Sequence, residues 1–164
     1  MKSESLATFA DRWRHVHAMT TEFARAVPEA AWVSSPRAGF APFHKQLRHV
    51  VCVRGVYNEA LRTARVDFGR KHAHYSGPLD RAPLLDALER RSQELLELLE
   101  GLGDEVSAPS IDLFGHAVSI AQHLYGYVQH EAIHHGQWSL YAAAAGYETP
   151  ALWRIQWGLG ESHV

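Results

Sequence analysis

The segment HEAIHHGQ, residues 130–137, contains two histidines whose spacing suits a shared metal ion. His130 and His134 are four residues apart. A helix turns about 100° per residue, so their side chains differ by only about 40° around its axis. His135 follows His134 directly, points about 100° away and is therefore a poor third ligand. Because a catalytic metal site needs about three protein ligands and one open position, a third ligand is expected from another helix.

His49 is the best candidate for that third ligand, because it lies among apolar residues of another helical segment. A lone histidine in such a place is more often a hydrogen-bonded core or boundary residue, so its position alone leaves both interpretations open. Cys52 follows three residues later, roughly 60° away, and is a rival as nucleophile or ligand. The simpler interpretation of Cys52 is a small buried core residue. Three neutral imidazoles would leave a metal its full positive charge, which acidifies a bound water or thiol.

The letters from His130 to His134 also form the motif H-E-x-x-H, in which Glu131 would be the base of a zinc peptidase. Gln137 and Leu140 stand where the longer peptidase pattern requires Gly and His, so this class is the least favoured. Glu131 is rotated about 100° from the ligand face. It is a candidate base or hydrogen-bond partner of a ligand, and a solvated or packing role is the alternative.

Three further polar residues are candidates for lining the site. Tyr127 and His123 lie one and two helical turns before His130, where either could orient a substrate, and His123 could also close the metal site. Gln137 could bond a ligand imidazole. Packing within a bundle is the alternative for all three. His17, between arginines near the N-terminus, is expected at the surface.

The periodicity of apolar residues predicts four long helices that would position these side chains. Ser119 and Gln122 form a capping box before the last of them, and Gly146 ends it. Asp80 is a plausible N-cap for the third, and Gly101 and Gly103 are expected to stop it. The fold prediction is an all-α four-helix bundle with long connections. The predicted helices are Ser5–Ala26, Pro42–Thr63, Arg81–Leu102 and Ile120–Ala145.

The segments that connect the predicted helices also contain patterns that indicate structure. Residues 64–80 and 103–118 are longer than a tight bundle turn needs. The stretch IDLFGHAV, residues 111–118, predicts a short hairpin or extended piece. The tail LWRIQWGL, residues 152–159, contains two tryptophans and is expected to pack back on the bundle. The loop at 64–80 is either a lid over the site or a simple exposed connection.

Composition narrows the class of protein. A chain of 164 residues suggests one domain over residues 1–164. A net charge of −2 provides no basic surface for nucleic acid, and no apolar run is long enough for a membrane span. A single cysteine and an N-terminus without an apolar leader favour a cytoplasmic location. Histidine is the anomaly, with 12 copies, and it is the commonest metal ligand.

The chain resembles the DinB/YfiT-like family of small four-helix-bundle metalloenzymes. The resemblance lies in KQLRHVVCVRGVYNEAL (45–61) and QHEAIHHGQWSLYAAAAGYETP (129–150). The family has a histidine on the second helix, then H-x-x-x-H followed by H-x-G-Q on the last long helix. Those positions correspond here to His49, to His130 and His134, and to the run 135–137.

The resemblance implies one divalent ion, zinc or nickel, held by His49, His130 and His134, and it implies a homodimer. It also implies membership of a group of proteins that contains thiol-dependent S-transferases and a mycothiol-dependent isomerase. The function expected is therefore a metal-dependent enzyme acting on a small molecule. It would be an S-transferase using a low-molecular-weight thiol or a small-molecule hydrolase. The alternatives are a non-enzymatic metal-binding or stress-response module and a helical interaction protein whose histidines only pack.

Overall fold

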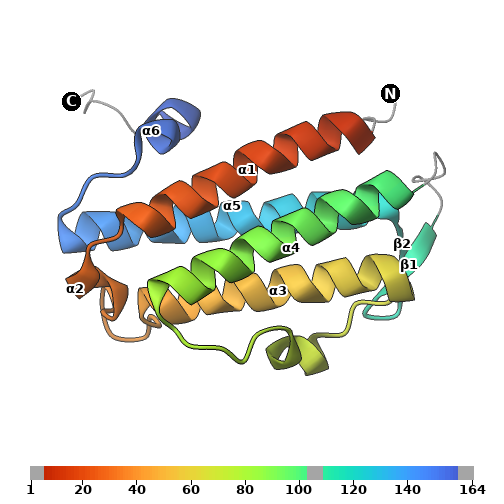
Figure 1. The fold of residues 1–164 in the computed structure, drawn as a ribbon, viewed down its shortest axis with the longest axis horizontal. Coiled ribbons are helices and arrows are strands. Elements are labelled where there is room, and N and C mark those ends of the chain that lie inside the picture. The colour runs from red at the N-terminus through yellow and green to blue at the C-terminus, as the bar shows by residue number, and fades with distance from the viewer. Residues whose placement is uncertain (1–5, 103–108, 159–164) are drawn as a thin grey trace.

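The computed structural model describes residues 6–102 and 109–158, and Figure 1 shows their arrangement. Ser5 and Gly103, the predicted start of the first helix and stop of the third, lie outside these residues. The long helices agree with the prediction to within one residue at each described end. In chain order the elements are α1 (Leu6–Ala26), α2 (Glu29–Trp32), α3 (Phe43–Thr63), η1 (Phe68–His74), α4 (Arg81–Gly101), β1 (Pro109–Leu113), β2 (His116–Ser119), α5 (Ile120–Ala145) and α6 (Ala151–Trp157).

Four long helices, α1, α3, α4 and α5, form an all-α bundle (Figure 1). Helix α5 contacts α1 and α3, and α4 contacts the same two helices from the other side. The bundle order is therefore α1, α4, α3, α5. This order makes α3 and α5 neighbours, which is the arrangement that a site shared by His49 and the histidines of α5 requires. None of the helices in the described ranges is long and apolar enough to cross a membrane.

The ends of the helices follow from local chemistry. Ser119 accepts from the backbone of Gln122, and the Gln122 side chain accepts from the backbone of Ser119, which confirms the predicted capping box. Gly146 ends α5 with a φ of 71°, a left-handed conformation that glycine adopts without strain. Asp80 occupies the N-cap position of α4, but its side chain makes no capping hydrogen bond.

The tail packs on the bundle as predicted, through α6. Trp153 is completely buried, and its Nε1 donates to the carbonyl of Met19 over 2.8 Å. Its ring contacts Phe23 and Trp138 in the aromatic core. The second tryptophan of the tail, Trp157, remains 45% exposed. One indole therefore anchors α6 to α1 and α5.

The two long connections contain structure of their own. Residues 109–119 form the predicted hairpin, with β1 and β2 antiparallel. The connection from α3 to α4 contains the 3₁₀ helix η1, which packs along α3. A Cβ at Gly55 would lie 2.5 Å from the Cβ of His74, so glycine is what allows this close approach. The 64–80 connection is thus attached to the helix that carries His49.

Candidate metal centre

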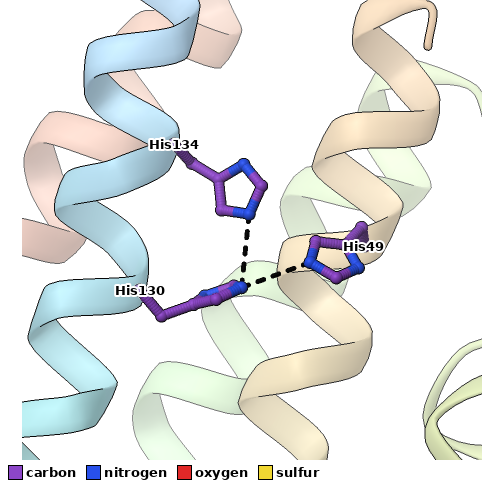
Figure 2. Close-up of side chains that lie close together, drawn as sticks. All are labelled: His49, His130 and His134. Carbon is purple, nitrogen blue, oxygen red and sulfur yellow. Dashed lines mark hydrogen bonds between the residues drawn. The ribbon is translucent and has the colours of Figure 1, made fainter. Parts of the chain in front are cut away.

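Three histidine side chains from two helices converge on one point (Figure 2). Nε2 of His130 lies 3.2 Å from Nε2 of His49 on α3 and 3.2 Å from Nε2 of His134 on α5. All three ligand atoms lie within 4.8 Å of one another. His134 is buried, whereas the other two are half-buried, so solvent reaches part of the cluster. The three residues predicted as ligands are therefore brought together, and they could hold a metal ion.

Hydrogen bonding between neutral imidazoles does not account fully for this arrangement. Each neutral ring has one donor nitrogen and one acceptor nitrogen. Nε2 of His130 faces two other Nε2 atoms at once, so one of the two contacts lacks a proper hydrogen bond. A cation, in contrast, binds all three lone pairs. Nitrogens bound to one tetrahedral zinc ion stand about 3.3 Å apart, close to the spacing observed. The donor set fits a divalent ion.

All three imidazoles are held in the neutral form that binds metals. Burial, with the neighbouring His134, lowers the pKa of His49 to about 4. The same two causes lower the pKa of His130 to about 3. Burial also lowers the pKa of His134 from its ordinary value. Since protons compete with metals for imidazole nitrogen, these shifts leave the three ligands available at neutral pH.

Basic side chains of η1 and α3 lie near His49 and Cys52. Besides burial and the neighbouring ligand, Lys71 and His72 of η1 lower the pKa of His49. Burial raises the pKa of Cys52, and Arg48 and Lys71 oppose this rise. Cys52 is buried, as its core interpretation predicted, and its Sγ lies 3.9 Å from the carbonyl of Tyr75. An anion bound beside the histidines would be stabilised by Lys71 and Arg48.

Glu131 points into the bundle rather than remaining free beside the histidines. Its side chain is completely buried. Oε1 accepts from Arg54 Nε and Oε2 accepts from Arg54 Nη2, both over 2.9 Å, and Oε2 accepts from Thr20 over 2.7 Å. Burial raises the pKa of Glu131, but Arg54 outweighs burial and the pKa falls to about 2. A carboxylate so fully paired is not the free base that the peptidase interpretation requires.

Tyr127 and His123 both lie in the interior. Tyr127 is completely buried, and its hydroxyl donates to the carbonyl of Arg54 and to Oδ1 of Asn58. His123 Nε2 lies 3.0 Å from the carbonyl of Tyr57. Among the described residues, the metal-binding group contains neither. Their observed contacts correspond to the packing alternative.

Gln137 is the one secondary candidate that stays beside a ligand. Its Oε1 and the Nδ1 of His134 are both buried, and neither has a partner of good hydrogen-bond geometry. Gln137 nevertheless lies close enough to His134 to oppose the lowering of its pKa. Of the two unpaired atoms, Oε1 of Gln137 is a hydrogen-bond acceptor and Nδ1 of His134 is a potential donor.

The buried arginine is the feature that sequence reasoning missed. Arg54 is completely buried, and the available signal was an arginine inside the apolar run VVCVRGV, residues 50–56.

His17 was expected at the surface, which is wrong. Its side chain is only 12% exposed, because its two nitrogens contact Arg54 and Glu89 over 3.0 and 2.9 Å between α1 and α4.

Comparison with known proteins agrees with the fold. Two solved structures of DinB-like proteins are similar to this chain, one from Bacillus subtilis and one from Bacillus cereus. The first has a TM-score of 0.68, 16% identity and coverage of 88% of this chain and 96% of its own. The second has a TM-score of 0.73, 16% identity and coverage of 88% and 95%. No curated protein matches the chain. The DinB superfamily profile matches residues 12–138, and the chain therefore belongs to the DinB superfamily.

Proposed function

We propose that this protein is a metal-dependent S-transferase that binds a divalent ion, zinc or nickel, through His49, His130 and His134. The observation that carries the proposal is the convergence of three neutral imidazoles. Nε2 of His130 lies 3.2 Å from Nε2 of His49 and 3.2 Å from Nε2 of His134. Among the described residues, the group contains no fourth side chain. That leaves a coordination position for a substrate, as catalytic sites require.

A thiol suits this site better than water does. A divalent ion held by three imidazoles supplies positive charge that favours the thiolate form of a bound thiol. A thiol has an ordinary pKa of about 8.5, so it ionises without a strong base. Glu131, the acidic side chain nearest in sequence, is engaged by Arg54. The Lys71 ammonium near His49 further favours an anionic nucleophile.

Gln137 has a role in orienting the site under this proposal. A metal-binding histidine usually donates its second ring N–H to an acceptor, which fixes the ring orientation. Nδ1 of His134 and Oε1 of Gln137 are buried and unpaired. A small rotation of the Gln137 amide would join them and hold Nε2 of His134 toward the other two ligands.

We also propose that the protein is a homodimer that uses the exposed face of α5. This helix contains one acidic residue and no lysine or arginine, and the acidic residue, Glu131, is buried. Tyr125, Ile133 and Leu140 are 58%, 62% and 58% exposed on the same helix. Sedimentation equilibrium of wild type and of Ile133→Glu tests this proposal. A monomeric wild type contradicts it, and loss of the dimer in the variant supports it.

Elemental mass spectrometry of tag-free protein tests the metal site. About one divalent ion per chain is expected in wild type and in His116→Ala, which removes an exposed histidine of β2. Loss of the ion is expected in His49→Ala and His134→Ala. The metal-loaded protein is then screened for transfer between small thiols and electrophiles. Wild type without metal after reconstitution contradicts the metal site, and bound metal without turnover favours a non-enzymatic metal-binding module.

A further inference from the structure

We infer that the buried pair of Arg54 and Glu131 is a positioning device that sets α3 and α5 in the register at which the three histidines meet. The inference rests on the proposed metal site. The pair joins the same two helices that carry the ligands. Arg54 lies five residues after His49 on α3, and Glu131 directly follows His130 on α5.

The geometry of the pair constrains two helices more tightly than apolar contacts do. Two parallel hydrogen bonds of 2.9 Å connect the guanidinium to the carboxylate. Such a bidentate contact is directional, so it resists both sliding and rotation of one helix against the other. Sliding by one residue is about 1.5 Å along a helix. A shift of that size would break both bonds and would also disrupt the 3.2 Å contacts between His49, His130 and His134.

Contacts from the other two helices hold the pair in place. Thr20 of α1 donates to Oε2 of Glu131, and its Oγ1 also lies 2.8 Å from Nε2 of His135. Arg54 Nη1 donates to the carbonyl of Leu88 on α4. The guanidinium also lies 4.8 Å from the centre of the Trp13 ring of α1. Each of the four bundle helices therefore contributes to fixing this one ion pair.

A role in stability alone predicts something different. Replacement of a buried ion pair by apolar residues of similar volume is often neutral or stabilising. If the pair only filled the core, Arg54→Met/Glu131→Leu would keep both the fold and the metal affinity. If the pair positions the ligands, the double variant keeps the fold but binds metal more weakly and in an altered geometry.

Cobalt(II) titration of tag-free, metal-free protein tests the inference, with the visible absorption spectrum reporting geometry and chelator competition giving affinity. The matched control is Arg81→Leu, which removes two bonds of 2.6 Å from the Arg81 guanidinium to the carbonyls of Ala24 and Val27. These bonds join α4 to the end of α1 and involve neither the ion pair nor the Trp13 ring. Wild type and the control are expected to share one spectrum and one affinity. The folded double variant is expected to lose about 10–100-fold in affinity and to change its spectrum.

The outcomes separate this inference from the proposed function. A folded wild type that binds no cobalt contradicts the metal site itself, and the positioning role with it. Normal binding in wild type together with equal affinity and spectrum in the double variant overturns the positioning role alone. If the double variant does not fold, Arg54→Lys decides, because lysine keeps the charge but cannot form the bidentate contact. Unchanged cobalt affinity in folded Arg54→Lys overturns the inference, and weakened affinity supports it.

Discussion

Zinc is expected to raise the melting temperature of the metal-free protein by a predictable amount. The 3.2 Å contacts of His130 Nε2 with His49 and His134 are already close to the spacing of about 3.3 Å that a tetrahedral zinc ion requires, so little binding free energy is used in rearrangement. Free zinc at 100 times its dissociation constant stabilises the folded state by about 2.7 kcal/mol. For a chain of this size, each kcal/mol corresponds to roughly 2–4 °C. The expected rise is therefore about 5–11 °C.

The assay is thermal unfolding of tag-free protein followed by circular dichroism over a range of free zinc concentrations. Each variant is compared with its own metal-free form, so a change in intrinsic stability does not affect the result. His49→Ala removes one of three ligands and is expected to lose most of the rise. His116→Ala removes an exposed histidine outside the cluster and is expected to keep it. A wild type whose melting temperature is insensitive to zinc would refute the reasoning, as would an equal rise in His49→Ala.

Three further predictions follow from the same side chains. In the metal-free protein, the pKa is lowered to about 4 for His49 and to about 3 for His130, so below pH 6.5 the unfolded chain binds protons that the folded chain does not. Urea titrations should therefore show the free energy of unfolding falling from pH 6.5 to 4. The slope should be at most about 1.4 kcal/mol per pH unit for each histidine, reduced by solvent screening, and a flat profile would contradict the shifts. Glu131→Leu leaves the arginine that pairs with it buried and unpaired, so urea unfolding should show a loss of about 3–5 kcal/mol, whereas a loss below 1 kcal/mol would argue against the pair. Gly55→Ala should destabilise the protein by about 1–3 kcal/mol, because the new Cβ would lie 2.5 Å from His74, and an unchanged denaturation midpoint would show that η1 moves freely.

Local sequence signals predicted the elements well because their causes are local. The apolar periodicity of α3 and α5 and the capping box at Ser119 depend on residues only a few positions apart. The same holds for the left-handed end of α5 at Gly146. The side-chain cap expected from Asp80 was wrong, although the helix begins there. The position of a helix start therefore depended less on one hydrogen bond than on the apolar face that follows.

The sequence by itself determined which side chains could act together on one helix. The four-residue spacing of His130 and His134 sets them on one face, because helix geometry relates them directly. The helical pattern made His49 a candidate for the third ligand, and the resemblance to a known family strengthened that expectation. Only the tertiary structure decided that His49 meets them, because that depends on how α3 packs on α5.

The tertiary structure also decided the role of Glu131, which the motif alone left open. Its partner, Arg54, lies 77 positions away in the sequence, and no local pattern connects the two. A buried ionised carboxylate is costly unless a cation or hydrogen-bond donors pair with it, and the packing of the four helices brings Arg54 to Glu131. Spacing along a helix thus determined the metal-binding pair on α5. Contact between α3 and α5 determined the third ligand, His49, and the ion pair of Arg54 and Glu131, because both depend on how segments distant in the sequence pack together.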